Sequence, residues 1–264
     1  MNRYKLYNGD NIDVLGQIEN ESVNLVVTSP PYDSLRTYDN ECEWNFDKFK
    51  RIADQLYRII VDGGVVVWVV NDQTVDGSET GSSFRQALYF KDIGFNIHDT
   101  MIWNKNTCHF PTELRYANCF EYMFIFSKNR PSFVNKIKDR INLYSGKNIH
   151  GTVRGADGNM VRKSNHNIKT VEEYGERFNI WNISPESHNT SNHPAVFPVQ
   201  LAHDHIISWS KEGDVVLDPF MGSGTTGVAA IQLHRKFIGI EINKDYFDYA
   251  KQRIESTTIS KKLF

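Results

Sequence analysis

Short apolar runs alternate with segments of helical periodicity along most of the chain. The runs at residues 23–27, 65–70 and 215–217 are nearly continuous and rich in β-branched side chains, as in strands that are covered on both faces. Residues 45–61 instead carry apolar side chains three and four positions apart, which predicts an amphipathic helix. Strands that alternate with helices predict an α/β fold with a mostly parallel, twisted sheet and helices on both faces.

The same patterns predict the remaining strands and helices. Further strands are expected at residues 4–6, 97–103, 122–126 and 237–240, and further helices at 12–18, 83–90, 199–209, 228–233 and 244–254. A length of 264 residues fits one large domain of this kind together with an insertion.

The insertion is indicated by charge. Residues 128–177 hold 11 lysines and arginines against five aspartates and glutamates, so this stretch has a net charge of +6 and the rest of the chain −8. Such asymmetry is typical of a face that contacts phosphates, although a solvated surface insertion has the same composition. The candidate DNA-binding side chains are Lys136, Lys138, Arg140, Arg154, Arg162 and Lys163.

Composition restricts the remaining classes. No run approaches the roughly 18 apolar residues of a membrane span, and residues 1–10 lack the pattern of a signal peptide. Three scattered cysteines without a Cys-x-x-Cys pair argue against disulfide or zinc frameworks and favour a reducing cytoplasm. His193, His203 and His205 have no acidic or cysteine partner at metal-ligand spacing, so we predict no metal and place them on a helix surface.

The rest of the chain is organised around a glycine-rich turn between a strand and a helix, residues 217–227. Gly222 and Gly224 let the backbone approach a ligand closely, and Thr225 and Thr226 stand where a helix begins and offers free amide groups. With Gly227 the spacing also satisfies the dinucleotide fingerprint. A nicotinamide-dependent oxidoreductase and a merely structural turn are therefore alternatives.

Two acidic residues narrow these alternatives. Glu241 ends the next strand about 20 positions later, where α/β folds hold a ribose hydroxyl. Asp218 opens the turn itself, and a carboxylate there would repel the pyrophosphate of a dinucleotide. A P-loop is excluded because no Gly-Lys-Ser/Thr follows the glycines.

A second motif follows the strand at residues 23–27. Thr28 and Ser29 precede Pro30-Pro31-Tyr32, and two consecutive prolines end the strand because they fix the backbone and lack amide donors. They form a rigid platform between a hydroxyl and an aromatic ring.

Four segments, residues 27–32, 193–198, 218–226 and 238–243, together resemble the exocyclic-amino DNA methyltransferases of the N4-cytosine/N6-adenine group in their beta arrangement. The resemblance implies a circularly permuted, Rossmann-like fold and an enzyme that uses S-adenosylmethionine as its methyl donor. It assigns residues 1–127 to a catalytic half, 128–181 to target recognition and 182–264 to a cofactor half. The final helix is then expected to lead back to residues 4–6.

The resemblance also assigns the site. Catalytic residues would be Ser29, Pro30, Pro31 and Tyr32, and S-adenosylmethionine would be held by Asp10, Phe197, Asp218, Pro219, Phe220, Gly222, Gly224, Thr225, Thr226 and Glu241. The implied partner is double-stranded DNA, with a cognate restriction endonuclease as a further candidate. A monomer and a homodimer are both compatible with the sequence.

The residue types suit this chemistry. Ser29 Oγ and the Pro30 carbonyl would accept the two protons of an exocyclic amine, and Tyr32 would stack on a base flipped out of the duplex. Serine before Pro-Pro-Tyr favours cytosine N4, with adenine N6 as the alternative. A C5-cytosine enzyme would need a cysteine after proline, and a zinc deaminase Pro-Cys-x-x-Cys; the sequence has neither. An inactive DNA-binding module is the remaining alternative.

Overall fold

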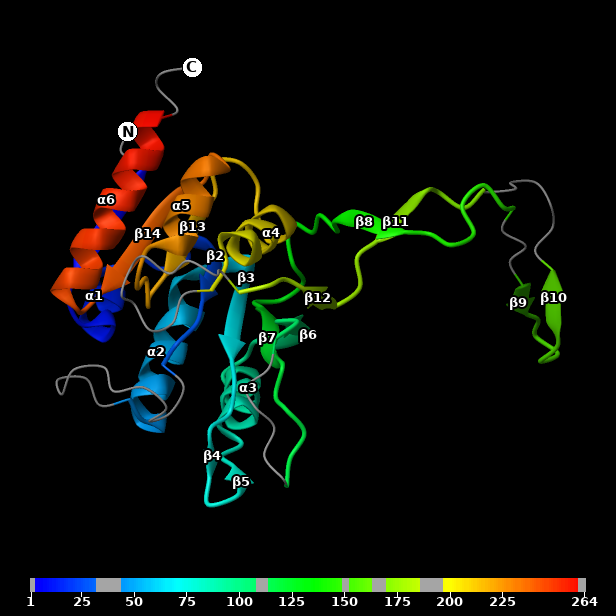
Figure 1. The fold of residues 1–264 in the computed structure, drawn as a ribbon, viewed down its shortest axis with the longest axis horizontal. Coiled ribbons are helices and arrows are strands. Elements are labelled where there is room, and N and C mark those ends of the chain that lie inside the picture. Colours follow the sequence, from blue (N-terminus) through cyan, green and yellow to red (C-terminus); the bar gives the residue numbers. More distant parts are fainter. Residues whose placement is uncertain are drawn as a thin grey trace. The chain divides into compact units, whose positions relative to one another are not determined.

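The computed structural model describes residues 3–31, 44–107, 114–148, 152–162, 170–185 and 197–260. In these residues an eight-stranded sheet has the order β1-β14-β13-β2-β3-β7-β6-β12 (Figure 1). Its strands are β1 (Tyr4–Asn8), β2 (Val23–Thr28), β3 (Ile60–Val70), β6 (Asn96–Asn104), β7 (Phe120–Ser127), β12 (Ile180–Asn182), β13 (Val215–Asp218) and β14 (Lys236–Glu241). The first five strands in this order pair in parallel, and β7 runs antiparallel to both of its neighbours.

Helices cover both faces of this sheet, as the alternating pattern predicts. They are α1 (Asn11–Gln17), α2 (Phe46–Ile59), α3 (Ser82–Asp92), α4 (Val199–Trp209), α5 (Thr225–Gln232) and α6 (Lys244–Ser260). The first three contact one another in order, as do the last three. None of the helices in the described ranges is long and apolar enough to cross a membrane.

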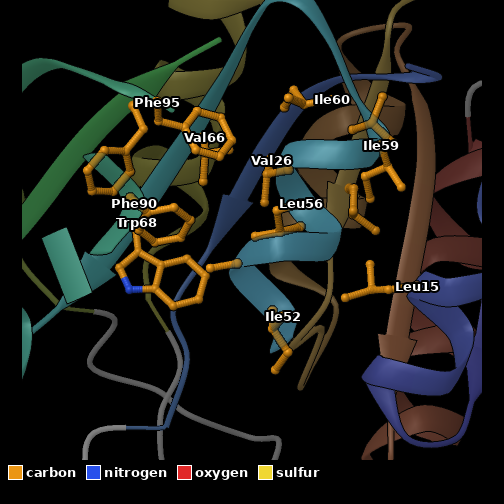
Figure 2. Packing of buried hydrophobic residues seen from close by; sticks show 14 of the residues in the cluster. Leu15, Val26, Ile52, Leu56, Ile59, Ile60, Val66, Trp68, Phe90 and Phe95 are labelled. Carbon is orange, nitrogen blue, oxygen red and sulfur yellow. The ribbon is translucent and has the colours of Figure 1, made fainter. Parts of the chain in front are cut away.

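One large cluster of the core lies between the sheet and the helices α1, α2 and α3, and buried apolar side chains of α4, α5 and α6 form the core on the other side. Helix α2 begins after Asn45, whose side chain accepts a hydrogen bond from the Lys48 amide at 2.9 Å, and this cap satisfies one of the free amides at the helix start. Its apolar stripe, which includes Ile52 and Leu56, is fully buried beside Trp68 (Figure 2). Each fully buried side chain of this size contributes roughly 1.5–3 kcal/mol to folding.

The chain ends meet in the sheet, as the permuted order predicts. Strand β1 pairs in parallel with β14, with Asn8 opposite Glu241, and α6 contacts β1. The last strand of the sequence therefore lies beside the first, so residues from both ends of the chain contribute to one sheet edge.

Residues 136–178 form a second compact unit. It contains two antiparallel strand pairs, β8 (Lys138–Ile141) with β11 (Tyr174–Glu176) and β9 (Thr152–Arg154) with β10 (Met160–Arg162). This unit is shorter than the expected insertion because residues 128–135 are bonded to the sheet domain. The Gly63 amide donates to the Lys128 carbonyl at 2.7 Å, and the Ser132 amide donates to the Gly63 carbonyl at 2.9 Å. A further antiparallel pair, β4 (Thr74–Val75) with β5 (Ser78–Glu79), belongs to the sheet domain.

Candidate cofactor and methyl-transfer site

The predicted site residues of the sheet domain gather at the carboxyl ends of adjacent parallel strands. Asp10 follows β1, Glu241 ends β14, Asp218 ends β13 and Ser29 follows β2. This edge is where open α/β sheets bind their ligands, because strand ends and helix starts leave polar groups exposed there. Four residues that are far apart in the sequence thus form one row.

The glycine-rich turn occupies the centre of this row. Gly222 and Gly224 have φ values of 50° and 82°, in the left-handed region that glycine adopts without strain. Helix α5 begins directly after Gly224. Arg253 of α6 fixes the turn by donating to the Ser223 carbonyl at 2.7 Å and to the Ser223 hydroxyl at 3.1 Å. The turn is therefore held in shape by the protein itself.

Glu241 contacts this turn directly. One carboxylate oxygen accepts from the Gly222 amide at 2.8 Å and the other from the Asn243 amide at 2.9 Å. Burial raises the pKa of Glu241, and the charge of Asp218 raises it further, against the effect of the amide hydrogen bonds. The sequence predicted that Glu241 binds a ribose, but it did not predict that Glu241 also holds the glycine-rich turn in place. That role depends on the hydrogen bond from the Gly222 amide, which joins residues 19 positions apart.

Asp218 is almost completely buried, with 1% of its surface exposed. Its Oδ1 accepts from the Thr28 hydroxyl at 2.6 Å and from the Phe220 amide at 3.1 Å. Burial raises the pKa of Asp218 to about 6, although these hydrogen bonds and one from Thr226 favour the charged form. Thr28 was not among the predicted site residues, since its partner lies 190 positions away.

Asp10 holds the start of α1. Its Oδ1 accepts from the Ile12 amide at 2.8 Å and its Oδ2 from Lys48 Nζ at 2.9 Å. Partial burial raises the pKa of Asp10, but the hydrogen bonds from Lys48 and the Ile12 amide and the charges of Lys48 and Arg51 together outweigh it, so the pKa of Asp10 is lowered. This carboxylate therefore carries its charge at the end of β1.

Asn11, next to Asp10, was also missed by sequence reasoning. It is buried, and its Nδ2 donates to the Pro219 carbonyl at 3.3 Å. Among the described residues, its Oδ1 has no hydrogen-bond partner. Because buried polar atoms are usually hydrogen-bonded, the Asn11 Oδ1 suits a ligand that carries a hydrogen-bond donor at this position.

Hydrophobic contacts complete the turn. The ring of Phe220 packs edge-on against Trp44 and Trp68, with centroid distances of 5.4 Å and 6.2 Å. Pro219 is buried and Phe197 is half-buried. Thr225 and Thr226 are buried, and the Thr226 hydroxyl lies 3.3 Å from the Val27 carbonyl.

The predicted catalytic motif lies beside this turn because β2 and β13 are neighbours in the sheet. Pro30 is buried, and Ser29 and Pro31 are half-buried at the end of β2. Tyr32 lies outside the described residues. Three of the four predicted catalytic residues therefore follow directly on Thr28, whose hydroxyl is bonded to Asp218.

The predicted DNA-binding residues belong to the second unit. Lys136 and Lys138 are exposed and form ion pairs with Glu176 at 2.5 Å and Glu172 at 3.1 Å. The Arg140 guanidinium lies 4.5 Å from the centre of the Phe178 ring. Arg154 is exposed on β9, only the backbone of Arg162 is described, and Lys163 lies outside the described residues.

The prediction that the histidines lie on a helix surface was wrong for His205. This side chain is fully buried in α4 and stacks on Trp181 at 4.4 Å, because α4 faces the sheet on this side. His203 is partly exposed and His193 lies outside the described residues. In the described ranges, no group of three His, Cys, Asp or Glu side chains is placed to hold a metal ion.

The donor set of this edge suits a ligand with cationic and hydroxyl groups. Three carboxylates, a buried amide oxygen and a glycine turn converge there. They would repel a pyrophosphate, as argued for Asp218, which disfavours a dinucleotide.

A model of the N6/N4 methyltransferase family, described as DNA methylase, matches residues 23–252. The chain belongs to this family of DNA methylases. The DNA methylase is therefore an S-adenosylmethionine-dependent enzyme.

Curated relatives cover nearly the whole methylase. The orphan methyltransferase M.BamHII of Bacillus amyloliquefaciens is 53% identical over 91% of this chain and 92% of its own. The type II methyltransferase M.SmaI of Serratia marcescens is 29% identical, with coverage of 95% and 90%. The DNA adenine methyltransferase YhdJ of Escherichia coli is 26% identical, with coverage of 95% and 82%.

Solved structures share the fold. TTHA0409, a DNA modification methylase of Thermus thermophilus in complex with S-adenosyl-L-methionine, superimposes with a TM-score of 0.65 at 24% identity and covers 97% of this chain and 96% of its own. The cytosine-N4-specific PvuII DNA methyltransferase gives a TM-score of 0.67 at 20% identity, with coverage of 98% and 91%.

Proposed function

We propose that this methylase transfers a methyl group from S-adenosylmethionine to the exocyclic N4 amine of a flipped cytosine at a specific DNA site. The observation that carries this proposal is the placement of Ser29 directly after Thr28, the last residue of β2, whose hydroxyl is bonded to Asp218 at the end of the neighbouring strand β13. Donor and acceptor of the methyl group would then meet between two neighbouring strand ends.

The roles of the site residues follow from their chemistry. When bound, S-adenosylmethionine supplies a methyl group that is open to nucleophilic attack. Asp218 would face the cationic methionine part of the cofactor, Glu241 its ribose and Asp10 the region of its adenine. Phe197 and Phe220 would contribute apolar walls to the same pocket.

Ser29 would act on the target base. An exocyclic amine is a poor nucleophile because its lone pair is delocalised into the ring. Acceptance of its protons by Ser29 Oγ and the Pro30 carbonyl would favour the pyramidal nitrogen that attacks, which is stabilisation of the transition state by fixed dipoles. Tyr32 would stack on the flipped base and offset part of the cost of unstacking.

The choice of base rests on Ser29. A neutral serine in this position resembles the N4-cytosine branch, and the fold neighbour from PvuII is described as cytosine-N4-specific. Adenine N6 is the second candidate, since YhdJ, a relative over most of its length, is described as an adenine methyltransferase. Both amines present the same two donors, so the width of the base pocket also contributes.

The second unit, residues 136–178, would bind the DNA. Its antiparallel strand pairs carry Arg140, which is half-buried, and Arg154, which is exposed, and neutralising phosphates with such side chains is the main source of DNA affinity. We expect the enzyme to act in the cytoplasm, as an orphan like M.BamHII or beside a restriction endonuclease.

Mass spectrometry of nucleosides tests the base. DNA methylated by the purified enzyme should contain N4-methylcytosine, and N6-methyladenine alone would overturn the cytosine assignment. An inactive DNA-binding module would bind DNA and leave both bases unmodified. A nicotinamide-dependent enzyme would be stabilised thermally by NAD rather than by S-adenosylhomocysteine.

A serine pair tests the catalytic assignment. Ser29→Ala should lower turnover by about 10²-fold or more while the affinity for S-adenosylmethionine stays close to that of the wild type. The matched control is Ser22→Ala. Ser22 is also half-buried, and it directly precedes the start of β2, whereas Ser29 directly follows its end. Equal turnover of the two variants would refute the role of Ser29.

A further inference from the structure

Thr28 connects the two halves of the site. It is the last residue of β2, directly before Ser29, and it is fully buried. Its hydroxyl donates to Asp218 Oδ1 at 2.6 Å, which joins the ends of β2 and β13. The strand that leads into the catalytic motif is thus bonded to the carboxylate that opens the cofactor turn.

This hydrogen bond bears on the charge of Asp218. Burial disfavours the carboxylate and raises its pKa to about 6, so the donors that favour the charged form decide how much of it exists near neutral pH. Three donors do so, the hydroxyls of Thr28 and Thr226 and the amide of Phe220. The Thr226 hydroxyl has one proton and also lies 3.3 Å from the Val27 carbonyl, whereas Thr28 approaches Asp218 at 2.6 Å.

Other charged groups lie on the neighbouring elements. The negative charge of Asp218 raises the pKa of Glu241 of β14, because two nearby carboxylates each disfavour ionisation of the other. On the strand beyond, Asp10 is paired with Lys48 of α2, and Arg253 of α6 is bonded to Ser223. Both cations are thus engaged elsewhere, which leaves the stabilisation of the Asp218 carboxylate to hydrogen bonds.

We propose that Thr28 is a positioning residue of the methyl-transfer site, which holds Asp218 in its charged form and in place for the cationic end of S-adenosylmethionine. This inference rests on the proposed role of Asp218 as a ligand of the methionine part. The Thr28 backbone continues into Ser29, so the same bond also fixes the distance between the cofactor and the catalytic serine.

Thr28→Val removes the hydroxyl and keeps the shape of the side chain. Loss of one hydrogen bond to a charged acceptor should raise the pH at which Asp218 ionises by about one unit. Relative to wild type, the affinity for S-adenosylmethionine should then fall by about fivefold at about pH 6 and about twofold at about pH 7, and the difference should vanish at about pH 9. Isothermal titration calorimetry without DNA measures the ratio of the wild-type affinity to the Thr28→Val affinity at each pH. Any protonation of S-adenosylmethionine itself affects both proteins equally and cancels in this ratio.

Two further variants serve as controls. Thr28→Ser restores the hydroxyl and should return the pH dependence of the affinity to that of the wild type. Thr100→Val makes the same chemical change at an exposed position of β6, three strands away in the same sheet, and should leave the affinity unchanged at every pH. Thermal melting of each variant reports whether it folds.

The outcomes separate this inference from the role of Asp218. If Asp218→Asn leaves the affinity for S-adenosylmethionine unchanged, the role of Asp218 fails, and the inference fails with it. If Asp218→Asn weakens binding while Thr28→Val weakens it equally at all pH values, or Thr28→Ser fails to restore the wild-type profile, Thr28 is only a packing residue and the inference alone is overturned.

Discussion

The cofactor turn (residues 218–226) and the second unit (residues 136–178) use polar side chains in opposite ways. In the turn, polar groups are buried and have fixed partners within the sheet domain, as Asp218 has in Thr28 and Ser223 in Arg253. In the second unit, charged side chains such as Lys136, Lys138 and Arg154 are exposed. The comparison shows how one chain combines a site of fixed, buried polar groups with a region whose charged side chains face solvent.

Exposed apolar side chains sharpen this contrast. In the second unit Leu143 is 90% exposed and Ile141 68% exposed. Cations lie over aromatic rings there, with Lys147 4.9 Å from the centre of the Tyr144 ring. Basic side chains interleaved with aromatic rings suit contact with nucleic acid.

The largest expected difference concerns the stability of the buried carboxylate. The pKa of Asp218 is raised from 3.8 to about 6 by burial, so between these values the folded protein binds more protons than the unfolded chain. Stability therefore falls as the pH rises through this window, by about 3 kcal/mol at most. The free energy of unfolding of wild type minus that of Asp218→Asn, measured by urea titration from about pH 4 to about pH 7, should decrease accordingly. A flat difference would show that Asp218 is not desolvated in solution.

The cofactor affinity of Asp218→Asn comes next. Loss of a charged acceptor near a cationic group should weaken S-adenosylmethionine binding by about 2 kcal/mol, or roughly 30-fold. Isothermal titration calorimetry at neutral pH measures this loss, and DNA affinity should stay the same. Unchanged binding of the cofactor would remove Asp218 from the site.

A pair of glycine variants tests how rigid the two regions are. A methyl group on Gly227 of α5 would lie 2.5 Å from Ile254 Cδ1 and 2.6 Å from the Phe237 ring, so Gly227→Ala should lower the free energy of unfolding by about 1–2 kcal/mol. In Gly175→Ala the new methyl group meets the movable ends of the Arg140 and Asn142 side chains, and the cost should be well below that of Gly227→Ala. Equal losses in chemical denaturation would contradict the contrast between the regions.

The smallest expected effect lies in the salt dependence of DNA binding. Arg154→Ala should reduce the slope of log affinity against log salt by about 1, since one phosphate contact is lost. Lys91→Ala, at an exposed position near the end of α3, is the control and should retain the wild-type slope. Fluorescence anisotropy over a salt series measures both. A wild-type slope in Arg154→Ala would exclude this residue from the DNA face.

Local sequence patterns predicted most of the sheet domain. Helix α4 spans Val199–Trp209, the same bounds that its periodicity predicts, and every expected strand of the large sheet lies within a strand of the structure. The helices were predictable because their apolar side chains repeat with a fixed period, and the central strands because they are short, nearly continuous apolar runs. The permuted order was predictable because each motif is local and recognisable in isolation.

The contacts between the site residues at the carboxyl ends of the strands could be found only from the tertiary structure. Thr28 and Asp218 are 190 positions apart, and Asn11 reaches Pro219 across 208 positions. His205 looked like a surface residue because its burial depends on Trp181, which returns to the sheet after the second unit. Periodicity records which face of an element is apolar. It does not record which element packs there, so hydrogen bonds and pKa values that depend on such neighbours follow only from the folded chain.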